Sequence, residues 1–326
     1  MSEVRLAHYG LDGHQLFHKA RDLSRVRLVG AGGLTKAQGA MAREKQPDVP
    51  LYDDLDTLME RSDPDLIVFC HTPRTEQTEL VIRALKARKH VLVEKPMAVS
   101  MPDLDRLREA AAEAGTVVRT MTMMPYSGDF TAMRRIIASG ALGSIVQIYA
   151  MKSYPYTDGR PQDRRVDGGL IEQAGIHAIS FIRYVTGLEF AEVFAQDTGV
   201  GNPKKGDLQL GATLSFRMNS GALAAVLCNY CNPRGVGYHG NDHLRIHGAN
   251  GFIELVDGRQ RRGVALGEES PRSFEDVAPG REYPQDIIDC ILDGTPTLLS
   301  QEDSFRNTEV VVRAQESAQT GKVIRL

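Results

Sequence analysis

Short apolar runs alternate with amphipathic helical patterns over the first 120 residues of the chain. The pattern predicts strands over residues 4–9, 26–31, 66–69 and 90–93. It predicts helices over residues 14–22, 36–43, 76–87 and 101–114. Strands that are apolar throughout, each followed by a helix, indicate a parallel sheet covered on both faces. We therefore expect an α/β, doubly wound sheet whose ligand site lies at the carboxyl ends of the strands.

The pattern changes after about residue 125. Helical patterns cover residues 130–139 and 174–186, and strands then follow one another without helices between them. Turn residues separate strand 208–216 from strand 222–230 and strand 243–247 from strand 252–256, which predicts two hairpins and a mostly antiparallel sheet. Residues 283–292 and 302–320 return to a helical pattern. We expect an α/β domain over residues 1–122 and an α+β domain over residues 123–326.

Charge and composition exclude several classes of protein. The 326 residues carry 39 Lys+Arg and 42 Asp+Glu, so the formal net charge is −3 and offers no basic surface for nucleic acid or anionic lipid. No apolar run approaches the roughly 20 residues that span a bilayer, and no signal sequence is recognised. Four cysteines are too few for a disulfide framework in a chain of this length. The expected location is the cytoplasm.

A turn with two glycines follows the first strand. The segment GLDGHQ (residues 10–15) stands where a dinucleotide-binding fold directs backbone N–H groups at the pyrophosphate. The full GxGxxG pattern is absent, because Asp12 occupies the central glycine position and Gln15 the last. Asp12 adds a negative charge where a pyrophosphate should approach. The segment is either a dinucleotide-binding turn or an ordinary turn between a strand and a helix.

The second strand ends in GAGGLTK (residues 30–36), without the acid that bonds the ribose 2′-hydroxyl of NAD. Thr35 and Lys36 would instead meet a 2′-phosphate, which favours NADP over NAD. The alternative is that Lys36 is a solvated lysine at the start of a helix.

The fourth strand ends in VEKP (residues 93–96). A lysine at the carboxyl end of a buried parallel strand lies in the expected ligand crevice, where burial lowers its pKa. Pro96 fixes the backbone beside it. Lys95 is therefore a candidate for bonding a substrate hydroxyl and moving its proton during hydride transfer.

A histidine follows a Gly-Gly turn further along the chain. Gln173 and His177 are four residues apart, so an α-helix would place them on one face. A histidine with a pKa near 6.5 is a natural general base for an alcohol proton. The alternative is a structural histidine on a half-buried helix.

Together these motifs resemble the glucose–fructose oxidoreductase/inositol dehydrogenase (Gfo/Idh/MocA) family. The resemblance rests on five segments and spans nearly the whole chain: residues 90–96 (HVLVEKP), 138–143 (ASGALG), 168–177 (GGLIEQAGIH), 287–296 (IIDCILDGTP) and the tail 289–326. It implies a dinucleotide-binding Rossmann domain over residues 1–122 and a substrate-binding and oligomerisation domain over residues 123–326. The implied activity is NAD(P)-dependent oxidation or reduction of a sugar, cyclitol or related polyol.

The resemblance also implies site residues. Lys95 and His177 fall on the family's catalytic lysine and histidine, and Gln173 joins them as a residue that orients His177 or the substrate. The expected cofactor-binding residues are Gly10, Leu11, Asp12, Gly13, His14, Thr35, Lys36, Thr72, Pro73, Gln77, Glu94 and Lys95. The expected substrate contacts are Met123, Tyr126 and Gln173.

The sequence departs from the family pattern around this site. The family's aspartate four residues before the histidine is Gln173, which cannot carry the charge that stabilises an imidazolium. The family's TPNxxH segment reads TPRTEQ (residues 72–77), and its Gly-His-Asn run reads MTM (residues 121–123). Either the substrate differs in shape and polarity, or ordinary hydride turnover is weakened or lost.

Two further patterns, one of cysteines and one of histidines, do not predict a metal site. Cys228 and Cys231 form a CxxC, but on a strand residues three apart point to opposite faces, and no second Cys/His pair stands at zinc spacing. His239, His243 and His247 are spaced like a helix face, but the surrounding glycines favour loop and strand. One of these histidines could contact substrate.

Three functions are consistent with these residues. The leading hypothesis is an NAD(P)-dependent dehydrogenase or reductase of a polyol, with NADP favoured. The second is a glycosidase or lyase that oxidises its substrate transiently with tightly held NAD. The third is a non-catalytic sugar-binding homologue, motivated by Gln173 and Asp12. An exposed antiparallel sheet face favours a homodimer or homotetramer.

Overall fold

The computed structural model describes residues 2–256, 258, 260–275, 277 and 281–326. The chain forms two compact units. The first unit comprises Met1–Met121 and Arg281–Arg306, and the second comprises Thr122–Gly280 and Asn307–Leu326. The first unit thus includes the segment Arg281–Arg306, which a linear division after residue 122 assigns to the second domain.

The first unit is built on a six-stranded parallel sheet, as the sequence predicts. Its strand order is β3-β2-β1-β4-β5-β6, so the order reverses between β1 and β4. The strands are β1 (Val4–Tyr9), β2 (Val26–Gly32), β3 (Leu51–Tyr52), β4 (Leu66–Phe69), β5 (His90–Val93) and β6 (Val118–Thr120). Every residue of β4 is buried, as expected for a central strand that is covered on both faces. A reversal of strand order creates a crevice at the carboxyl ends, where such sheets bind ligands.

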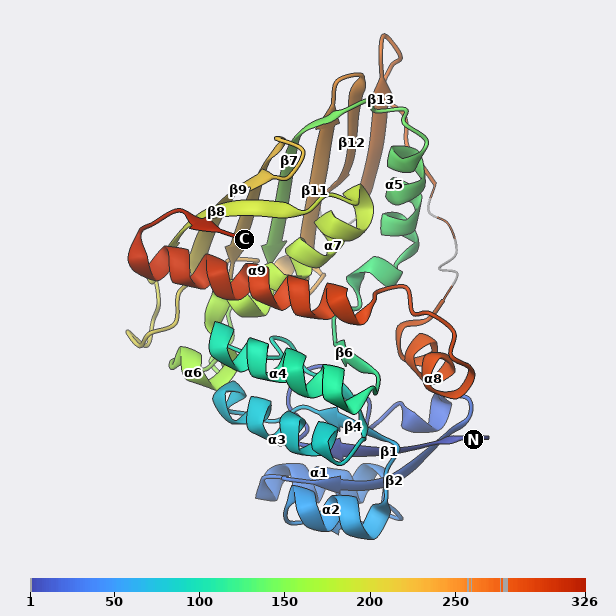
Figure 1. Cartoon of the computed structure of the whole chain (residues 1–326). Coiled ribbons are helices and arrows are strands. Elements are labelled where there is room, and N and C mark those ends of the chain that lie inside the picture. The colour runs from blue at the N-terminus through green and yellow to red at the C-terminus, as the bar shows by residue number, and fades with distance from the viewer. Residues whose placement is uncertain (1, 257, 259, 276, 278–280) are drawn as a thin grey trace. The chain divides into compact units, whose positions relative to one another are not determined.

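Helices cover this sheet. They are α1 (Lys36–Lys45), α2 (Leu55–Ser62), α3 (Arg74–Lys86), α4 (Met101–Ala114) and α8 (Tyr283–Asp293). The helices α3 and α4 pack side by side (Figure 1). Their apolar faces enter one core with β4 and β5, to which Leu85, Leu107, Phe69 and Val93 contribute. This core therefore fixes the position at which β5 ends, and with it the positions of Glu94 and Lys95, which follow the strand.

The helix predicted over residues 14–22 is wrong. Only a 3-10 helix, η1 (Ala20–Asp22), forms in this segment. The backbone N–H and the ring of His14 both bond the carboxylate of Glu94, which holds the chain outside a helix immediately after Gly13. The glycine turn after β1 is consequently not followed by an α-helix whose N-terminus could face a phosphate.

The second unit contains an eight-stranded sheet of order β13-β12-β11-β7-β10-β9-β8-β14. Its strands are β7 (Ile145–Ser153), β8 (Phe190–Thr198), β9 (Gly211–Met218), β10 (Leu223–Asn229), β11 (Asn241–Gly248), β12 (Gly251–Val256), β13 (Arg261–Leu266) and β14 (Ile324–Arg325). All neighbours are antiparallel except β7 and β10, and both predicted hairpins are present. Burial alternates along β9, so one face of the sheet is packed and the other is open.

The helices of the second unit are α5 (Gly128–Ala138), α6 (Arg164–Asp167), α7 (Ile176–Thr186), the 3-10 helices η2 (Met124–Tyr126) and η4 (Arg234–Val236), and the π-helix η3 (Ile171–Gly175). Of these, α7 and η3 pack on the sheet. Phe130 of α5 stacks on Phe181 of α7 with 4.8 Å between ring centroids. Figure 1 shows α5 and α7 beside the sheet. The remaining helix, α9 (Gln301–Thr320), is divided between the two units. No helix within the described ranges is long and apolar enough to cross a membrane.

Candidate active site

The glycine turn lies at the carboxyl end of β1. Gly10 and Gly13 adopt φ values of +75° and +76°, which favour glycine. A Cβ on Gly10 would lie 2.4 Å from the carbonyl oxygen of Cys70, and one on Gly13 would lie 2.7 Å from the carboxyl carbon of Glu94. Both glycines are therefore required by the close approach of the loops after β4 and β5.

Asp12 connects three segments at this edge of the sheet. Its carboxylate accepts one hydrogen bond from Thr72 Oγ1 at 2.6 Å and another from Gln38 Nε2 at 2.9 Å. Its backbone N–H donates to the carbonyl of Cys70 at 3.0 Å. The carboxylate thus lies between the loop after β4 and the first turn of α1. Leu11 beside it is buried, with 7% of its surface exposed.

The carboxyl end of β5 is tied to the same turn. Glu94 is 1% exposed and bonds both the backbone N–H of His14 at 3.1 Å and the His14 ring at 3.0 Å. Burial opposes ionisation of Glu94, but the His14 hydrogen bond and the positive charges of His14, Lys95 and Arg74 outweigh it and lower the pKa of this carboxyl. Glu94 is therefore an anion that fixes the glycine turn against β5.

Lys95 follows directly and is 5% exposed. Its ammonium lies 3.8 Å from Glu94 Oε1. The amide nitrogen of Gln77 holds the backbone on both sides of this lysine, since it donates to the carbonyls of Glu94 at 2.9 Å and Pro96 at 3.3 Å. Its contact with the cofactor stays a prediction. The Thr72–Pro73 and Lys95–Pro96 peptide bonds are both cis. The lysine is thus fixed by its neighbours in the chain and by α3.

The start of α1 carries the residues predicted to select the cofactor. Thr35 is the N-cap of α1, and its side chain accepts from Gln38 N at 3.3 Å while Gln38 Oε1 accepts from Thr35 N. Lys36 is the first helical residue and is exposed. Lys36 thus adds an exposed positive charge to a helix N-terminus that Thr35 and Gln38 cap.

His177 lies at the beginning of α7 in the second unit and is 2% exposed. Its ring centroid is 6.5 Å from that of Tyr154, which follows β7, at an interplanar angle of 71°. Tyr154 also contacts His239 at 5.1 Å between centroids and lies beneath Lys152 Nζ at 4.8 Å. An aromatic and cationic wall therefore adjoins His177 within this unit.

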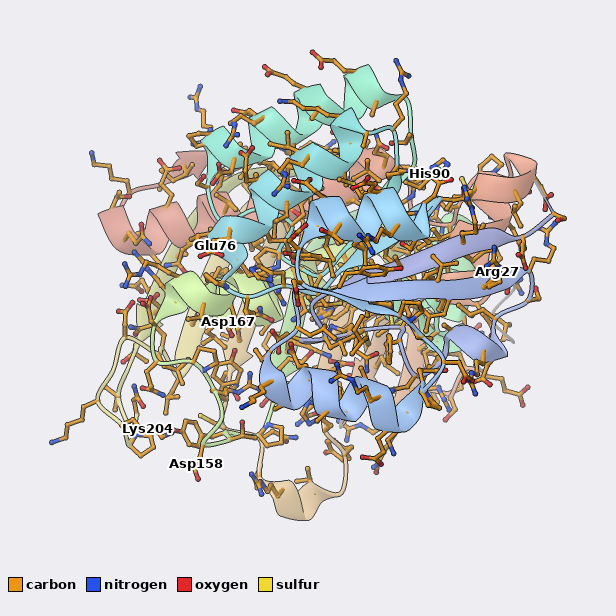
Figure 2. The ribbon with its side chains drawn as sticks, turned by 90° about the horizontal axis from the view of Figure 1, so that it is seen from below. Arg27, Glu76, His90, Asp158, Asp167 and Lys204 are labelled. Atoms are coloured by element: carbon orange, nitrogen blue, oxygen red, sulfur yellow. The ribbon has the colours of Figure 1, made fainter. Side chains whose placement is uncertain are left out.

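The segment before His177 is a π-helix, not the α-helix that the sequence suggests. A π turn bonds residues i and i+5, so the four-residue repeat that grouped Gln173 with His177 does not extend across it. The Gln173 amide nitrogen donates to the carbonyl of Asp167, a residue labelled in Figure 2. The catalytic role of Gln173 stays a prediction.

Glu172, which precedes Gln173, was not among the predicted site residues. Glu172 is 2% exposed, and its Oε2 has no hydrogen-bond partner among the residues that the structure describes. Burial raises the pKa of this carboxyl well above its usual value, while Arg164 opposes the shift and Asp167 adds to it. The signal for this residue in the sequence was an acidic side chain in a segment that is flanked by the apolar Ile171 and Ala174.

The remaining predicted residues differ in exposure. Met123 is 37% exposed, whereas Tyr126 in η2 is 7% exposed.

Cys228 is buried on β10 and Cys231 is exposed, in keeping with opposite faces. Within the described ranges, no group of His, Cys, Asp and Glu is arranged to hold a metal ion.

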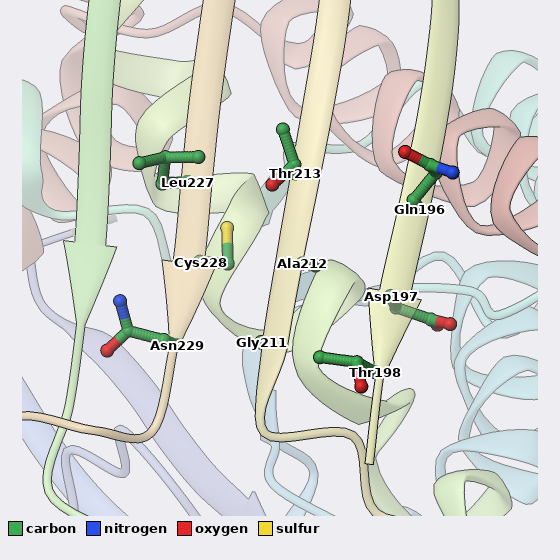
Figure 3. A pocket seen from close by; sticks show the side chains of 9 residues that line it. All are labelled: Gln196, Asp197, Thr198, Gly211, Ala212, Thr213, Leu227, Cys228 and Asn229. Carbon is green, nitrogen blue, oxygen red and sulfur yellow. The ribbon is translucent and has the colours of Figure 1, made fainter. Parts of the chain in front are cut away.

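A depression of about 440 Å³ lies on the sheet of the second unit (Figure 3). Strands β8, β9 and β10 line it through Gln196, Asp197, Thr198, Gly211, Ala212, Thr213, Leu227, Cys228 and Asn229. None of these is a predicted catalytic, cofactor or substrate residue. The depression therefore gives no support to the predicted site residues.

Lys95 belongs to the first unit and His177 to the second. Each has defined contacts within its own unit: Lys95 lies at a strand end that is bonded to the glycine turn, and His177 lies beside Tyr154. Their action on one substrate stays a prediction.

The strand order and the glycine turn define a dinucleotide-binding class of α/β protein. Residues 9–122 match the family description "Oxidoreductase family, NAD-binding Rossmann fold", and residues 130–254 match the "GFO/IDH/MocA C-terminal domain". The chain belongs to the Gfo/Idh/MocA family of oxidoreductases, as the sequence motifs indicated. It is accordingly an enzyme of the nicotinamide-dependent dehydrogenase class.

Relatives cover most of the chain. Myo-inositol 2-dehydrogenase of Thermotoga maritima is 27% identical over 87% of this chain and 86% of its own length. The scyllo-inositol 2-dehydrogenase (NAD(+)) of Bacillus subtilis is 22% identical over 99% of this chain and 96% of its own. A solved Thermotoga maritima structure is 25% identical, with a TM-score of 0.90 over 99% of this chain and 100% of that one.

Apart from the missing α-helix after the glycine turn, the residues of the first unit fit a dinucleotide, with one exception. The reversal of strand order, the glycines with positive φ and the exposed start of α1 are features that such a cofactor uses. Asp12 is the exception, because its carboxylate occupies the turn that approaches the pyrophosphate.

Proposed function

We propose that the protein is an NAD(P)-dependent dehydrogenase or reductase of a sugar, cyclitol or related polyol. The inositol dehydrogenases among its relatives support a polyhydroxylated substrate. The observation that carries the proposal is the bond between Glu94 and His14, because it joins the strand end bearing Lys95 to the glycine turn. This bond thus holds the glycine turn, which would bind the cofactor, against the strand end that carries the candidate catalytic lysine.

The dinucleotide, when bound, supplies the hydride acceptor or donor. Gly10, Leu11, Gly13 and His14 would form the turn around it. Lys95 would bond the reacting oxygen of the substrate, and His177 would take or return the hydroxyl proton. The uncharged Gln173 would bond a substrate hydroxyl, with Met123 and Tyr126 as further contacts.

A 2′-phosphate contact with Thr35 and Lys36 would favour NADP over NAD. The exposed N-terminus of α1 supports this preference. Replacing Lys36 by Ala should weaken NADPH binding more than NADH binding in calorimetric titrations. Equal effects on the two cofactors would remove Lys36 from the selectivity.

The test of the catalytic assignment is Lys95→Met. We expect turnover to be lost while the dinucleotide still binds and the folded state remains stable. Lys86→Met, at an exposed position of α3, is the matched control and should behave as the wild type. Retained turnover in Lys95→Met would exclude the lysine from the chemistry.

Asp12 bears on how tightly the cofactor binds. A carboxylate in the turn repels the pyrophosphate and would weaken cofactor binding. Absence of NADH and NADPH binding in a folded protein would overturn the proposal. A second candidate, a glycosidase or lyase with tightly held NAD, would instead release product without net change in NADH. We further propose a cytoplasmic homodimer or homotetramer, for which sedimentation is the test.

A further inference from the structure

The loop between β7 and α6 contains several buried polar donors without partners. Tyr156 Oη, Arg160 Nε and Gln162 Nε2 are buried, and each has no hydrogen-bond partner among the described residues. Buried polar groups in proteins are almost always paired with protein, water or ligand. Three such groups within seven residues indicate that this loop is built to hold something that accepts hydrogen bonds.

Arg160 carries the only formal charge among these three groups. Its guanidinium carbon lies 3.6 Å from the ring centroid of Tyr230 and 5.8 Å from that of Tyr154. The only hydrogen bond that the guanidinium makes to the described residues is a long one, from Nη2 to the Pro155 carbonyl at 3.5 Å. Aromatic stacking therefore fixes the plane of the guanidinium and leaves most of its N–H groups without a hydrogen-bond partner among the described residues.

The neighbouring cations differ, because each already has an anionic partner. Lys152 forms a buried ion pair with Asp242. Arg165 bonds the carboxylate of Asp163, and Arg164 lies 3.7 Å from that of Asp207. Within the described part of the chain, no carboxylate forms an ion pair with Arg160. The loop thus offers one preformed guanidinium to an outside anion.

Arg160 also adjoins the candidate proton-transfer group. Tyr154 contacts both the Arg160 guanidinium and the His177 ring. On the far side of the loop, Lys204 Nζ donates to the carbonyl of Asp158, and Figure 2 shows these two residues next to each other. The loop is therefore anchored, and the guanidinium is held one aromatic ring away from His177.

We propose that Arg160 binds an oxyanion group of the substrate, so that the substrate is a polyhydroxylated carboxylate or phosphate ester, not a neutral polyol. This inference rests on the proposed function and narrows its substrate class. A planar guanidinium binds such groups with two parallel N–H···O bonds. A neutral hydroxyl would leave the charge without a counterion, which is costly in a half-buried place.

The test compares kcat/KM for hexonates, hexuronates, hexose phosphates and neutral polyols, with both NAD+ and NADP+. We expect the wild type to prefer one anionic class, and the preferred arm distinguishes carboxylate from phosphate. Arg160→Gln should lose roughly 100-fold in kcat/KM on that class, mostly through KM, because a half-buried charge pair is broken. Its activity on neutral polyols should change less than about threefold.

Two further variants sharpen the result. Arg160→Lys keeps the charge without the planar fork and should recover only part of the loss. Arg165→Gln removes a neighbouring exposed arginine that is already paired with Asp163, and should resemble the wild type. Equal kcat/KM of wild type and Arg160→Gln on every class would overturn the inference while leaving the dehydrogenase intact.

Calorimetric titration with D-gluconate and glucose 6-phosphate separates the two proposals. If no substrate is turned over with either cofactor, the proposed function fails. Binding of one of these anions to the wild type and not to Arg160→Gln would still support the anion site. Absence of binding to both proteins, or equal binding, would overturn it.

Discussion

The hydroxyl of Thr72 donates a 2.6 Å hydrogen bond to the carboxylate of Asp12, which joins the loop after β4 to the glycine turn after β1. The second carboxylate oxygen accepts from Gln38 in the first turn of α1. An acid is thus held by two donors at the position where the family's turn has its central glycine. Its charge remains at the edge where a dinucleotide would bind.

Asp12→Asn should strengthen dinucleotide binding. Removing a like charge within a few ångströms of a pyrophosphate is worth about 1 kcal/mol in water and more in a partly buried site, so Kd should fall roughly fivefold or further. Titration calorimetry with NADH and NADPH measures this, and the absence of Trp makes intrinsic fluorescence a poor substitute. Asp48→Asn removes the same charge from an exposed position and is the control. Weaker binding by Asp12→Asn would mean that the carboxylate accepts hydrogen bonds from the cofactor.

Gly10→Ala should be much more destabilising than Gly115→Ala. Both glycines have positive φ, which costs an alanine about 1–2 kcal/mol. Around Gly115, the C-cap of α4, a Cβ would meet nothing within 4 Å, whereas at Gly10 it would lie 2.4 Å from a backbone oxygen. Denaturant unfolding gives the two free energies. Equal losses would show that the β4 loop moves away from the turn at little cost.

Much of the first unit follows from local pattern alone. The predicted bounds of β1, β4, β5 and α4 coincide with those of the structure, because apolar runs between turn residues mark strands buried on both faces. The strand β3 has only two residues and gives no periodic signal. The helix expected over residues 14–22 fails because long-range bonds from His14 to Glu94 determine that segment.

The candidate site, like the fold, could be predicted from the sequence only in part. Lys95 and His177 stand beside motifs with fixed local sequence, so reading along the chain finds them. Arg160 lies in a loop of Pro, Asp and Gly without periodicity, and only its stacking on Tyr230 distinguishes it from a solvated arginine. The π turn before His177 inserts a residue into a helical pattern, which a repeat of 3.6 residues cannot reveal.

His8 should make the protein less stable in acid. Burial lowers the pKa of His8 from 6.5 to about 3, and the charge of His18 contributes. Between these values the unfolded chain takes up a proton that the folded chain refuses, so unfolding becomes easier as pH falls from 6.5 toward 3. The slope is about 1.4 kcal/mol per pH unit.

His8→Leu should remove this dependence. Both ring nitrogens of His8 are buried without hydrogen-bond partners among the described residues, so no bond is lost. Urea unfolding of the wild type and the variant between pH 4 and pH 7 measures the change. An unchanged slope in His8→Leu would assign the acid sensitivity to other groups.

Glu172 should make the protein less stable as the pH rises. Its pKa is raised well above 4.5, chiefly by burial, so the folded state keeps a proton that the unfolded state releases. The stability that this carboxyl provides is therefore fully present below pH 4.5 and is lost as pH rises toward its folded pKa. The expected slope is again about 1.4 kcal/mol per pH unit over that interval.

Glu172→Gln is the corresponding variant, because an amide of nearly the same shape stays neutral at every pH. We expect it to match the wild type near pH 4 and to exceed its free energy of unfolding at pH 8. The exposed Glu268→Gln serves as control and should leave the pH profile unchanged. If Glu172→Gln is instead less stable than the wild type at pH 8, the carboxylate is ionised in the folded state and is stabilised by a partner that only the charged form binds.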